Sequence, residues 1–134
     1  MITVLLADDH VMVRDGLRYI LEAAGDIQII ALASNGKEAV AQASASCPNV
    51  AVIDISMPVM DGIEAARQIL RVCPHTRIVM LSMYHTGEYV QRALKAGAFG
   101  YVLKDGAGNE LVEAVRCLYA GKQYFSPQVA RYSI

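Results

Sequence analysis

The fold of this chain is decided by one stretch, VAVIDISMPVMDG, which runs from Val50 to Gly62. It opens with four apolar residues, most of them β-branched, stops at Asp54 and continues into a loop with a proline and a glycine. A short apolar run bounded by turn residues is typical of a buried parallel strand. An unpaired carboxylate is costly away from water, so we expect Asp54 at the C-terminal tip of this strand, facing a crevice. Open α/β sheets bind their ligands at that edge.

Apolar runs of this kind alternate along the chain with segments of helical periodicity. Strands are expected at 3–7, 27–33, 50–54, 78–81 and 101–103, each followed by an amphipathic helix. Residues 122–134 are expected to be irregular. The alternation predicts an α/β fold: a flavodoxin-like (βα)5 three-layer sandwich with a parallel five-stranded sheet in the order 2-1-3-4-5.

Length and composition indicate a single globular domain. The chain has 134 residues, and 12 basic against 13 acidic side chains give a formal net charge of −1. Without a basic tract, strong nucleic-acid binding by this domain alone is not expected. The N-terminus has no basic lead, and no apolar run reaches the length of a membrane span, so we expect a cytoplasmic protein with no membrane contact.

The cysteines give no sign of a cross-link. Cys47, Cys73 and Cys117 are widely spaced and odd in number, and they form no C-x-x-C pair. We therefore expect buried or incidental thiols, with neither a disulfide nor a zinc site.

Polar residues end four of the five expected strands. Asp8 and Asp9 follow the first, Asp54 ends the third, Ser82 ends the fourth and Lys104 ends the fifth. The tips of parallel strands share one edge, and the predicted strand order would gather these side chains into one pocket.

Three carboxylates in one pocket repel each other. Two unit charges about 4 Å apart interact by about 4 kcal/mol at an effective dielectric of about 20. A hard divalent cation offsets this repulsion, and Mg²⁺ is usually held by a few carboxylates together with waters and phosphate oxygens. A carboxylate nucleophile beside Mg²⁺ and an ammonium group is suited to phosphoryl transfer.

Five short motifs occur in order along nearly the whole chain: Asp8-Asp9, Asp54-Ile55-Ser56-Met57-Pro58, Asp61-Gly62, Ser82 and Gly100-Tyr101-Val102-Leu103-Lys104. Together they resemble the receiver domain of a two-component response regulator. The resemblance implies that Asp54 accepts a phosphoryl group and that Mg²⁺ is the cofactor. Its implied ligands are Asp9, Asp54 and the backbone carbonyl of Ser56, with Asp8 binding directly or through water.

The resemblance also implies a switch. A sensor histidine kinase would donate the phosphoryl group, Lys104 would pair with it, and Ser82 would shift toward it. Tyr101, the implied aromatic switch, would fill the space behind Ser82. This would shift a pre-existing equilibrium at the surface formed by the fourth helix, the fifth strand and the fifth helix. Ser56 and Tyr84 lie near the implied path of hydrolytic water. We expect a phosphoacceptor domain rather than an enzyme, one that at most catalyses its own phosphorylation and dephosphorylation.

Three further features are similar to the NarL/FixJ class of response regulators. They are Asp105 after the lysine, the opening 6–10 (Leu-Ala-Asp-Asp-His) and the tail 124–127 (Tyr-Phe-Ser-Pro). That class carries a C-terminal LuxR-type helix-turn-helix domain. The resemblance implies a receiver domain at 1–121 and the start of a linker at 122–134, with DNA binding through the absent domain and phosphorylation-dependent homodimerisation. A natural single-domain receiver is the alternative.

Simpler roles exist for individual residues. Asp8 and Asp9 alone would suit a helix cap, and Tyr101 could be a plain core or surface aromatic. Asp61 is expected to be a turn or helix-start residue rather than a metal ligand. His10 lies beside the acidic pair, but we expect no direct chemical role for it.

Three other functions are weaker alternatives. A haloacid-dehalogenase-type phosphatase would have a second aspartate two residues after its nucleophile, where this chain has Ser56. A pseudo-receiver would keep the fold without phosphorylation, which the full set of site residues disfavours. A flavodoxin needs hydroxyls and free amides after its first strand, where this chain is anionic.

Overall fold

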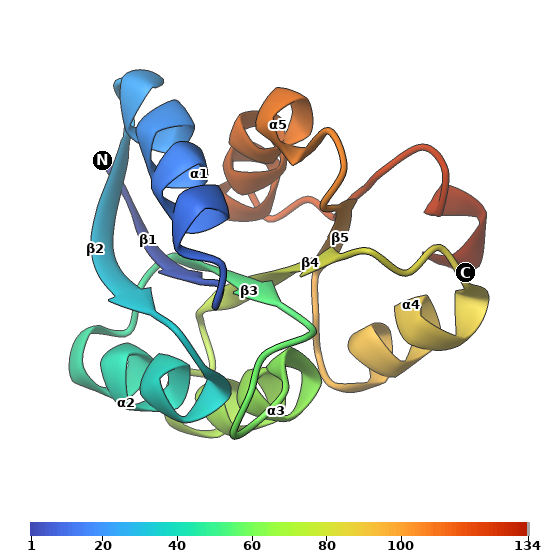
Figure 1. Ribbon diagram of the computed structural model, residues 1–134, viewed down its shortest axis with the longest axis horizontal. Coiled ribbons are helices and arrows are strands. Elements are labelled where there is room, and N and C mark those ends of the chain that lie inside the picture. The colour runs from blue at the N-terminus through green and yellow to red at the C-terminus, as the bar shows by residue number, and fades with distance from the viewer. Residues whose placement is uncertain (134) are drawn as a thin grey trace.

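The computed structural model describes residues 1–133, so residue 134 of the expected irregular tail lies outside it. Strands and helices alternate along the chain (Figure 1). Their order is β1 (Ile2–Ala7), α1 (Val11–Ala23), β2 (Ile27–Ala33), α2 (Gly36–Ser46), β3 (Val50–Asp54), α3 (Gly62–Val72), β4 (Arg77–Ser82), α4 (Gly87–Lys95), β5 (Gly100–Leu103), α5 (Ala107–Tyr119), β6 (Tyr124–Phe125) and the 3-10 helix η1 (Ala130–Ser133). No helix in this part of the chain is long and apolar enough to cross a membrane.

The sheet is parallel, with the strand order β2-β1-β3-β4-β5-β6. The predicted order 2-1-3-4-5 is confirmed, with one further strand at the β5 edge. Register pairs Ala7 with Ile53, Asp54 with Leu81, and Ser82 with Leu103. The tips of β1, β3, β4 and β5 therefore end at one edge of the sheet.

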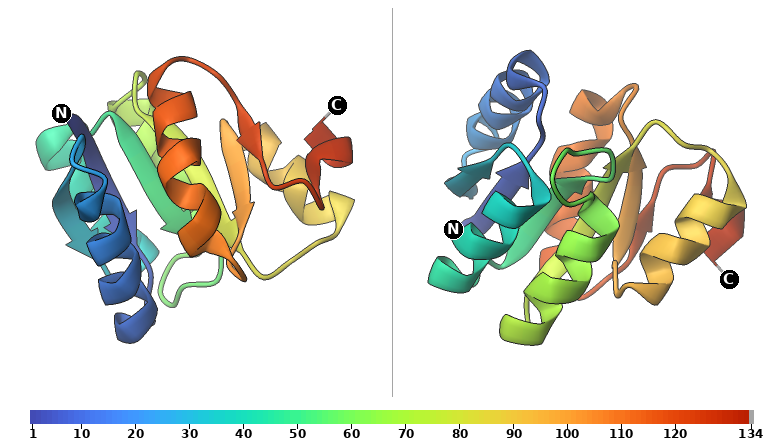
Figure 2. Two further views of the ribbon diagram at one scale, coloured as in Figure 1. Left: turned by 90° about the horizontal axis from the view of Figure 1, so that it is seen from above. Right: turned by 60° about the horizontal axis from the view of Figure 1, so that its bottom comes forward.

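Helices cover both faces of the sheet. Helices α1 and α5 lie on one face and α2, α3 and α4 on the other (Figures 1 and 2). In β1, Val4 and Leu6 join the core under α1 and α5, whereas Leu5 and Ala7 join the core under α2, α3 and α4. This alternation explains the continuous apolar run, because a strand covered on both faces has no solvent side.

The expectation of an irregular C-terminal segment is wrong for half of its described length, where β6 and η1 form. β6 pairs with β5, Ser126 N–H donates to the Tyr101 carbonyl at 2.9 Å, and Leu103 N–H donates to Ser126 Oγ at 3.0 Å. Val129 is fully buried. The segment supplies the hydrogen bonds that the edge of β5 would otherwise lack.

Replacing Val129 by alanine is therefore expected to destabilise the domain by about 2 kcal/mol, because it removes buried methyl groups and leaves a cavity. Gln128→Ala is the matched control, because Gln128 precedes Val129 in the chain and is exposed. Urea unfolding followed by circular dichroism measures both. Equal midpoints for the two variants would mean that the segment does not contribute to the core.

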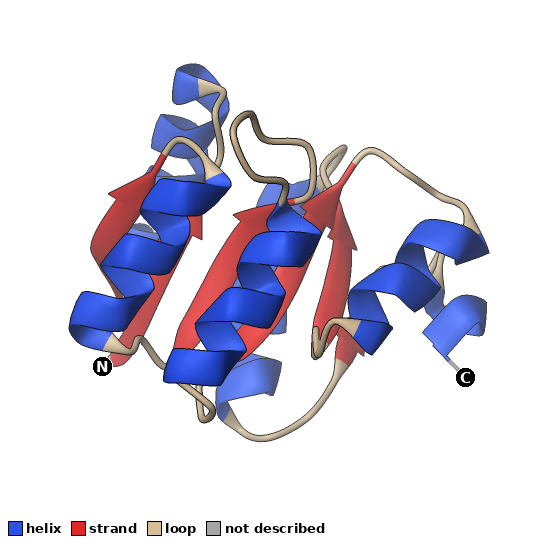
Figure 3. Cartoon of the chain, turned by 90° about the horizontal axis from the view of Figure 1, so that it is seen from below, coloured by secondary structure: helices blue, strands red, loops and turns tan. Residues whose placement is uncertain are grey.

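The expectation of no disulfide is also wrong, because Cys47 and Cys73 form one. Each cysteine follows the last residue of its helix, Cys47 after α2 and Cys73 after α3, and the two helices lie side by side (Figure 3). An odd count and wide spacing did not exclude this pair, because α/β packing brings the C-terminal ends of successive helices together. Cys117 is free.

Reduction is expected to lower the stability by about 3 kcal/mol, because the bond closes a loop between residues 26 positions apart and so restricts the unfolded chain. Thermal unfolding with and without dithiothreitol measures this effect. The Cys47→Ala variant should unfold at one temperature under both conditions. A reductant effect that persists in this variant would assign the sensitivity to something other than this disulfide.

Candidate functional site

Asp54 lies at the C-terminal tip of β3, as predicted, and only 2% of its surface is exposed to solvent. The loop after it returns so closely that a Cβ on Gly62 would lie 2.2 Å from the Asp54 carbonyl oxygen. Only glycine fits there. Asp61 caps α3 by accepting from Glu64 N–H at 2.9 Å, which confirms the prediction that it starts a helix.

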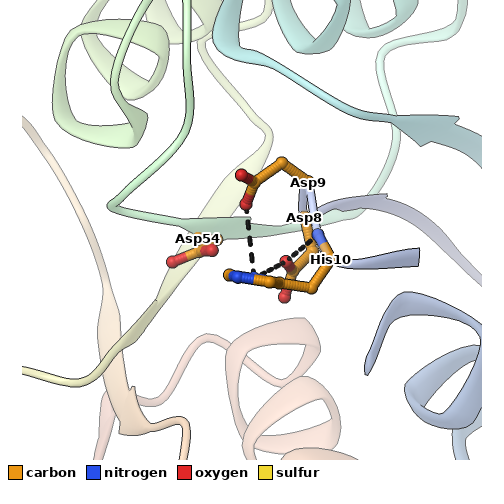
Figure 4. Close-up of side chains that lie close together, drawn as sticks. All are labelled: Asp8, Asp9, His10 and Asp54. Atoms are coloured by element: carbon orange, nitrogen blue, oxygen red, sulfur yellow. Dashed lines mark hydrogen bonds and ion pairs between the residues drawn. The ribbon is translucent and has the colours of Figure 1, made fainter. Parts of the chain in front are cut away.

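The tip of β1 brings two more carboxylates to Asp54. Asp8 is fully buried and its N–H donates to the Ala33 carbonyl, while Asp9 is partly exposed. Ligand atoms of Asp8, Asp9, His10 and Asp54 all lie within 4.8 Å of one another (Figure 4). The simpler role as helix caps does not hold, because the N-cap of α1 is His10.

Lys104 joins two of these carboxylates. Its Nζ lies 2.9 Å from Asp54 Oδ2 and 3.0 Å from Asp8 Oδ2, and its side chain is 10% exposed. Its backbone N–H donates to the Ser82 carbonyl at 2.7 Å, which fixes the tip of β5 against β4. Burial lowers the pKa of the Lys104 ammonium, but the hydrogen bonds and charges of Asp54 and Asp8 outweigh burial and raise the pKa.

The cluster is short of positive charge. Burial raises the pKa of Asp54, the hydrogen bond from Lys104 lowers it, and the charge of Asp8 raises it, with a net shift upward. Both partners of this ion pair thus have raised pKa values, Asp54 chiefly through burial and Lys104 through its hydrogen bonds to two carboxylates. A second cation would favour the ionised form of Asp54.

Ser82 and Tyr101 are hydrogen-bonded to each other. Tyr101 is 1% exposed, and its hydroxyl lies 2.8 Å from both Ser82 Oγ and the Tyr84 carbonyl. Ser82 Oγ also accepts from Tyr84 N–H at 2.9 Å. Burial raises the pKa of the Tyr101 phenol. Tyr101 is therefore a buried aromatic whose hydroxyl connects Ser82 to the loop after β4.

The domain also matches known proteins. The family model of the response regulator receiver domain matches residues 4–116. The chain belongs to the response regulator receiver family. The receiver domain is 41% identical over 124 residues to the uncharacterized transcriptional regulatory protein YxjL of Bacillus subtilis, covering 92% of this chain and 57% of YxjL. It is 38% identical to the response regulator UvrY of Escherichia coli K12, covering 98% and 60% of the two chains.

Solved structures show the same class. A LuxR-family two-component response regulator from Aurantimonas matches the receiver domain with a TM-score of 0.92 at 33% identity, covering 98% of this chain and 94% of that one. The receiver domain of a putative NarL from Mycobacterium tuberculosis matches with a TM-score of 0.85 at 33% identity, covering 90% and 98%. These matches support the NarL/FixJ class. The chain spans about three fifths of the length of the curated relatives that it matches.

As a family, response regulator receiver domains are phosphoacceptor switches that bind Mg²⁺ at an acidic pocket and work with histidine kinases. The structure brings together the predicted carboxylates and the ammonium, Asp8, Asp9, Asp54 and Lys104. It also places His10 in this cluster, a residue for which we expected no direct chemical role. His10 Nδ1 lies 3.2 Å from Asp8 Oδ1 and 3.0 Å from Lys104 Nζ. Its adjacency to the acidic pair was the only signal in the sequence.

Proposed function

We propose that this chain is a phosphorylation-activated receiver in which Asp54 accepts a phosphoryl group from a phosphohistidine of a sensor kinase. An Asp54 oxygen would attack phosphorus while the bond to the imidazole nitrogen breaks, and that nitrogen would take up a proton. The observation that carries the proposal is the shared contact of Lys104 with Asp54 and Asp8 at 2.9 and 3.0 Å. Positioning and charge neutralisation of this kind are most of what phosphoryl transfer requires.

The acidic cluster fits Mg²⁺. Asp9 Oδ1 is buried and accepts no hydrogen bond of good geometry within the described residues, and buried Asp8 Oδ2 has the Lys104 ammonium as its partner. These carboxylate oxygens are the hard donors that Mg²⁺ prefers. Asp9, Asp54, the backbone carbonyl of Ser56 and Asp8, directly or through water, would hold the ion. When bound, Mg²⁺ would neutralise charge on the carboxylates and on the transferred group.

The remaining site residues would read out phosphorylation. Ser82 would hydrogen-bond the phosphoryl group, Lys104 would pair with it, and Tyr101 would hold Ser82 in place from behind. The close hydrogen bonds among Ser82, Tyr101 and Tyr84 support this coupling. Because β5 carries Tyr101 beside α4 and α5, the equilibrium at this face would shift with phosphorylation.

The output of the full-length protein would be transcription. Residues 1–121 would form the receiver domain proper, residues 122–134 would lead into a linker, and a LuxR-type domain beyond them would bind DNA, with homodimerisation on phosphorylation. Relatives described as transcriptional regulators and as LuxR-family response regulators support this proposal. Gel-shift assays on the full-length protein, with and without phosphorylation, test it.

The proposed chemistry predicts metal-dependent labelling. Incubation with acetyl phosphate and Mg²⁺ is expected to add the mass of one phosphoryl group to the intact chain, and a chelator is expected to prevent this. The reason is that the carboxylate repulsion opposes an approaching anion until a cation offsets it. No labelling with Mg²⁺ present would favour the pseudo-receiver, a binding module with the same fold.

A further inference from the structure

Tyr84 connects the Asp54 site to helix α4. Its backbone holds both Ser82 and Tyr101 through hydrogen bonds of 2.9 and 2.8 Å. Its side chain contacts two other elements. The hydroxyl lies 3.4 Å from Ser56 Oγ in the loop after Asp54, and the ring stacks on Tyr89 with the centroids 3.9 Å and the planes 6° apart.

The two stacked rings are held unequally. Tyr84 follows the end of β4 in a loop and is 37% exposed. Tyr89 lies on α4, packs against the core under that helix, and has the Arg92 guanidinium 5.2 Å from its ring centroid. The next residue, Val90, is fully buried and anchors this turn of α4. Tyr89 is therefore the fixed partner, and Tyr84 is the ring that would move if the stack were lost.

We infer that Tyr89 is a positioning residue for hydrolysis of the phosphoryl group on Asp54. This inference rests on the proposed function. In hydrolysis, water attacks phosphorus, the bond to the Asp54 oxygen breaks, and the products are the aspartate, inorganic phosphate and a proton released to solvent. Ser56 N–H donates to Asp54 Oδ1 at 3.2 Å, so a ring held against Ser56 lies beside the acceptor and limits the approach of water.

The size of the effect follows from the stack. The Tyr84 ring can lie against Ser56, as in the structure, or away from it. The stacking energy of an aromatic pair is enough to change the equilibrium between these two positions by about two- to tenfold. Loss of the Tyr89 ring is expected to shorten the phosphoryl lifetime by the same factor. Helix α4 would then set how long the switch stays on, and any partner that moves α4 would alter that time.

The test measures phosphoryl lifetime in the whole chain. Protein is labelled with acetyl phosphate and Mg²⁺, the donor is removed by desalting, and the labelled fraction is followed by intact mass. Tyr89→Leu keeps apolar volume against the core without a flat ring, and its label should decay about two- to tenfold faster. Tyr89→Phe keeps the ring and should decay at the rate of the unsubstituted chain.

A double-variant cycle separates the stack from other effects. Tyr84→Leu removes the ring beside Ser56 itself, so its label should decay at least as fast as that of Tyr89→Leu. Combining the two changes should add nothing to Tyr84→Leu, because the ring that Tyr89 positions is already gone. Unchanged decay in Tyr89→Leu, equally fast decay in Tyr89→Phe, or additive effects would each overturn the inference while leaving phosphorylation of Asp54 intact. Absence of any label on the unsubstituted chain would instead overturn the proposed function.

Discussion

Replacing Asp54 by asparagine is expected to reduce Mg²⁺-dependent labelling by acetyl phosphate to background. The carboxamide has almost the same shape, but it offers no anionic oxygen to attack phosphorus. Intact mass spectrometry after incubation with the donor and Mg²⁺ measures the effect. Asp61→Asn is the matched control, because the Asp61 side chain is exposed, caps α3 and lies in the same loop.

The Asp54→Asn protein should also fold at least as well as the unsubstituted chain when metal is absent. Burial and the Asp8 charge raise the pKa of Asp54 in the folded state. When folding raises the pKa of a carboxyl group, the folded state is more stable with that group protonated than with it ionised. Ionisation at neutral pH therefore lowers the free energy of unfolding, and this loss is regained as the pH falls. Labelling that survives in this variant would place the acceptor elsewhere, and a large loss of stability would mean that the ion pair with Lys104 outweighs burial.

Replacing Lys104 by methionine is expected to destabilise the metal-free domain by about 3 kcal/mol, since it leaves two buried carboxylates without their shared cation. Asp54 and Asp8 raise the pKa of Lys104 despite its burial. The protonated form is thus favoured by folding, and its full contribution is present at neutral pH and is lost only as the pH rises through the raised pKa. Chemical denaturation at neutral pH measures the change.

Two controls define the cause of that loss. Lys122→Met removes an exposed ammonium and should leave stability nearly unchanged. Added Mg²⁺ should restore part of the stability of Lys104→Met, because a bound cation replaces the missing positive charge. A Lys104→Met protein as stable as the Lys122→Met control would show that the short contacts to Asp54 and Asp8 do not stabilise the fold.

Most of the fold was predictable because β1, β3, β4 and β5 are buried along almost their whole length. Such strands read as apolar runs in the sequence, and β2 and β3 have the predicted bounds. β6 was not predicted because a strand of two residues shows no periodicity in the sequence. The burial of Ser126 was not predicted either, because it comes from hydrogen bonds and not from an apolar side chain. The Cys47–Cys73 bond was not predicted because it depends on helix packing.

The site was predictable for a related reason. Asp54 and Lys104 interrupt apolar runs where parallel strands end, and the strand order brings the two side chains into contact. The inward position of Tyr101 was not predictable, since a buried tyrosine and an exposed one have the same sequence pattern. The stack of Tyr84 on Tyr89 depends on how the loop after β4 enters α4, which no spacing rule describes.

The most direct test of the account is to identify the residue that carries the phosphoryl group. The chain is labelled with acetyl phosphate and Mg²⁺, the acyl phosphate is reduced with borohydride, and the modified residue is located by peptide mass spectrometry. The account predicts conversion of Asp54 to homoserine and of no other aspartate. Modification at Asp8 or Asp9, with Asp54 unchanged, would contradict it.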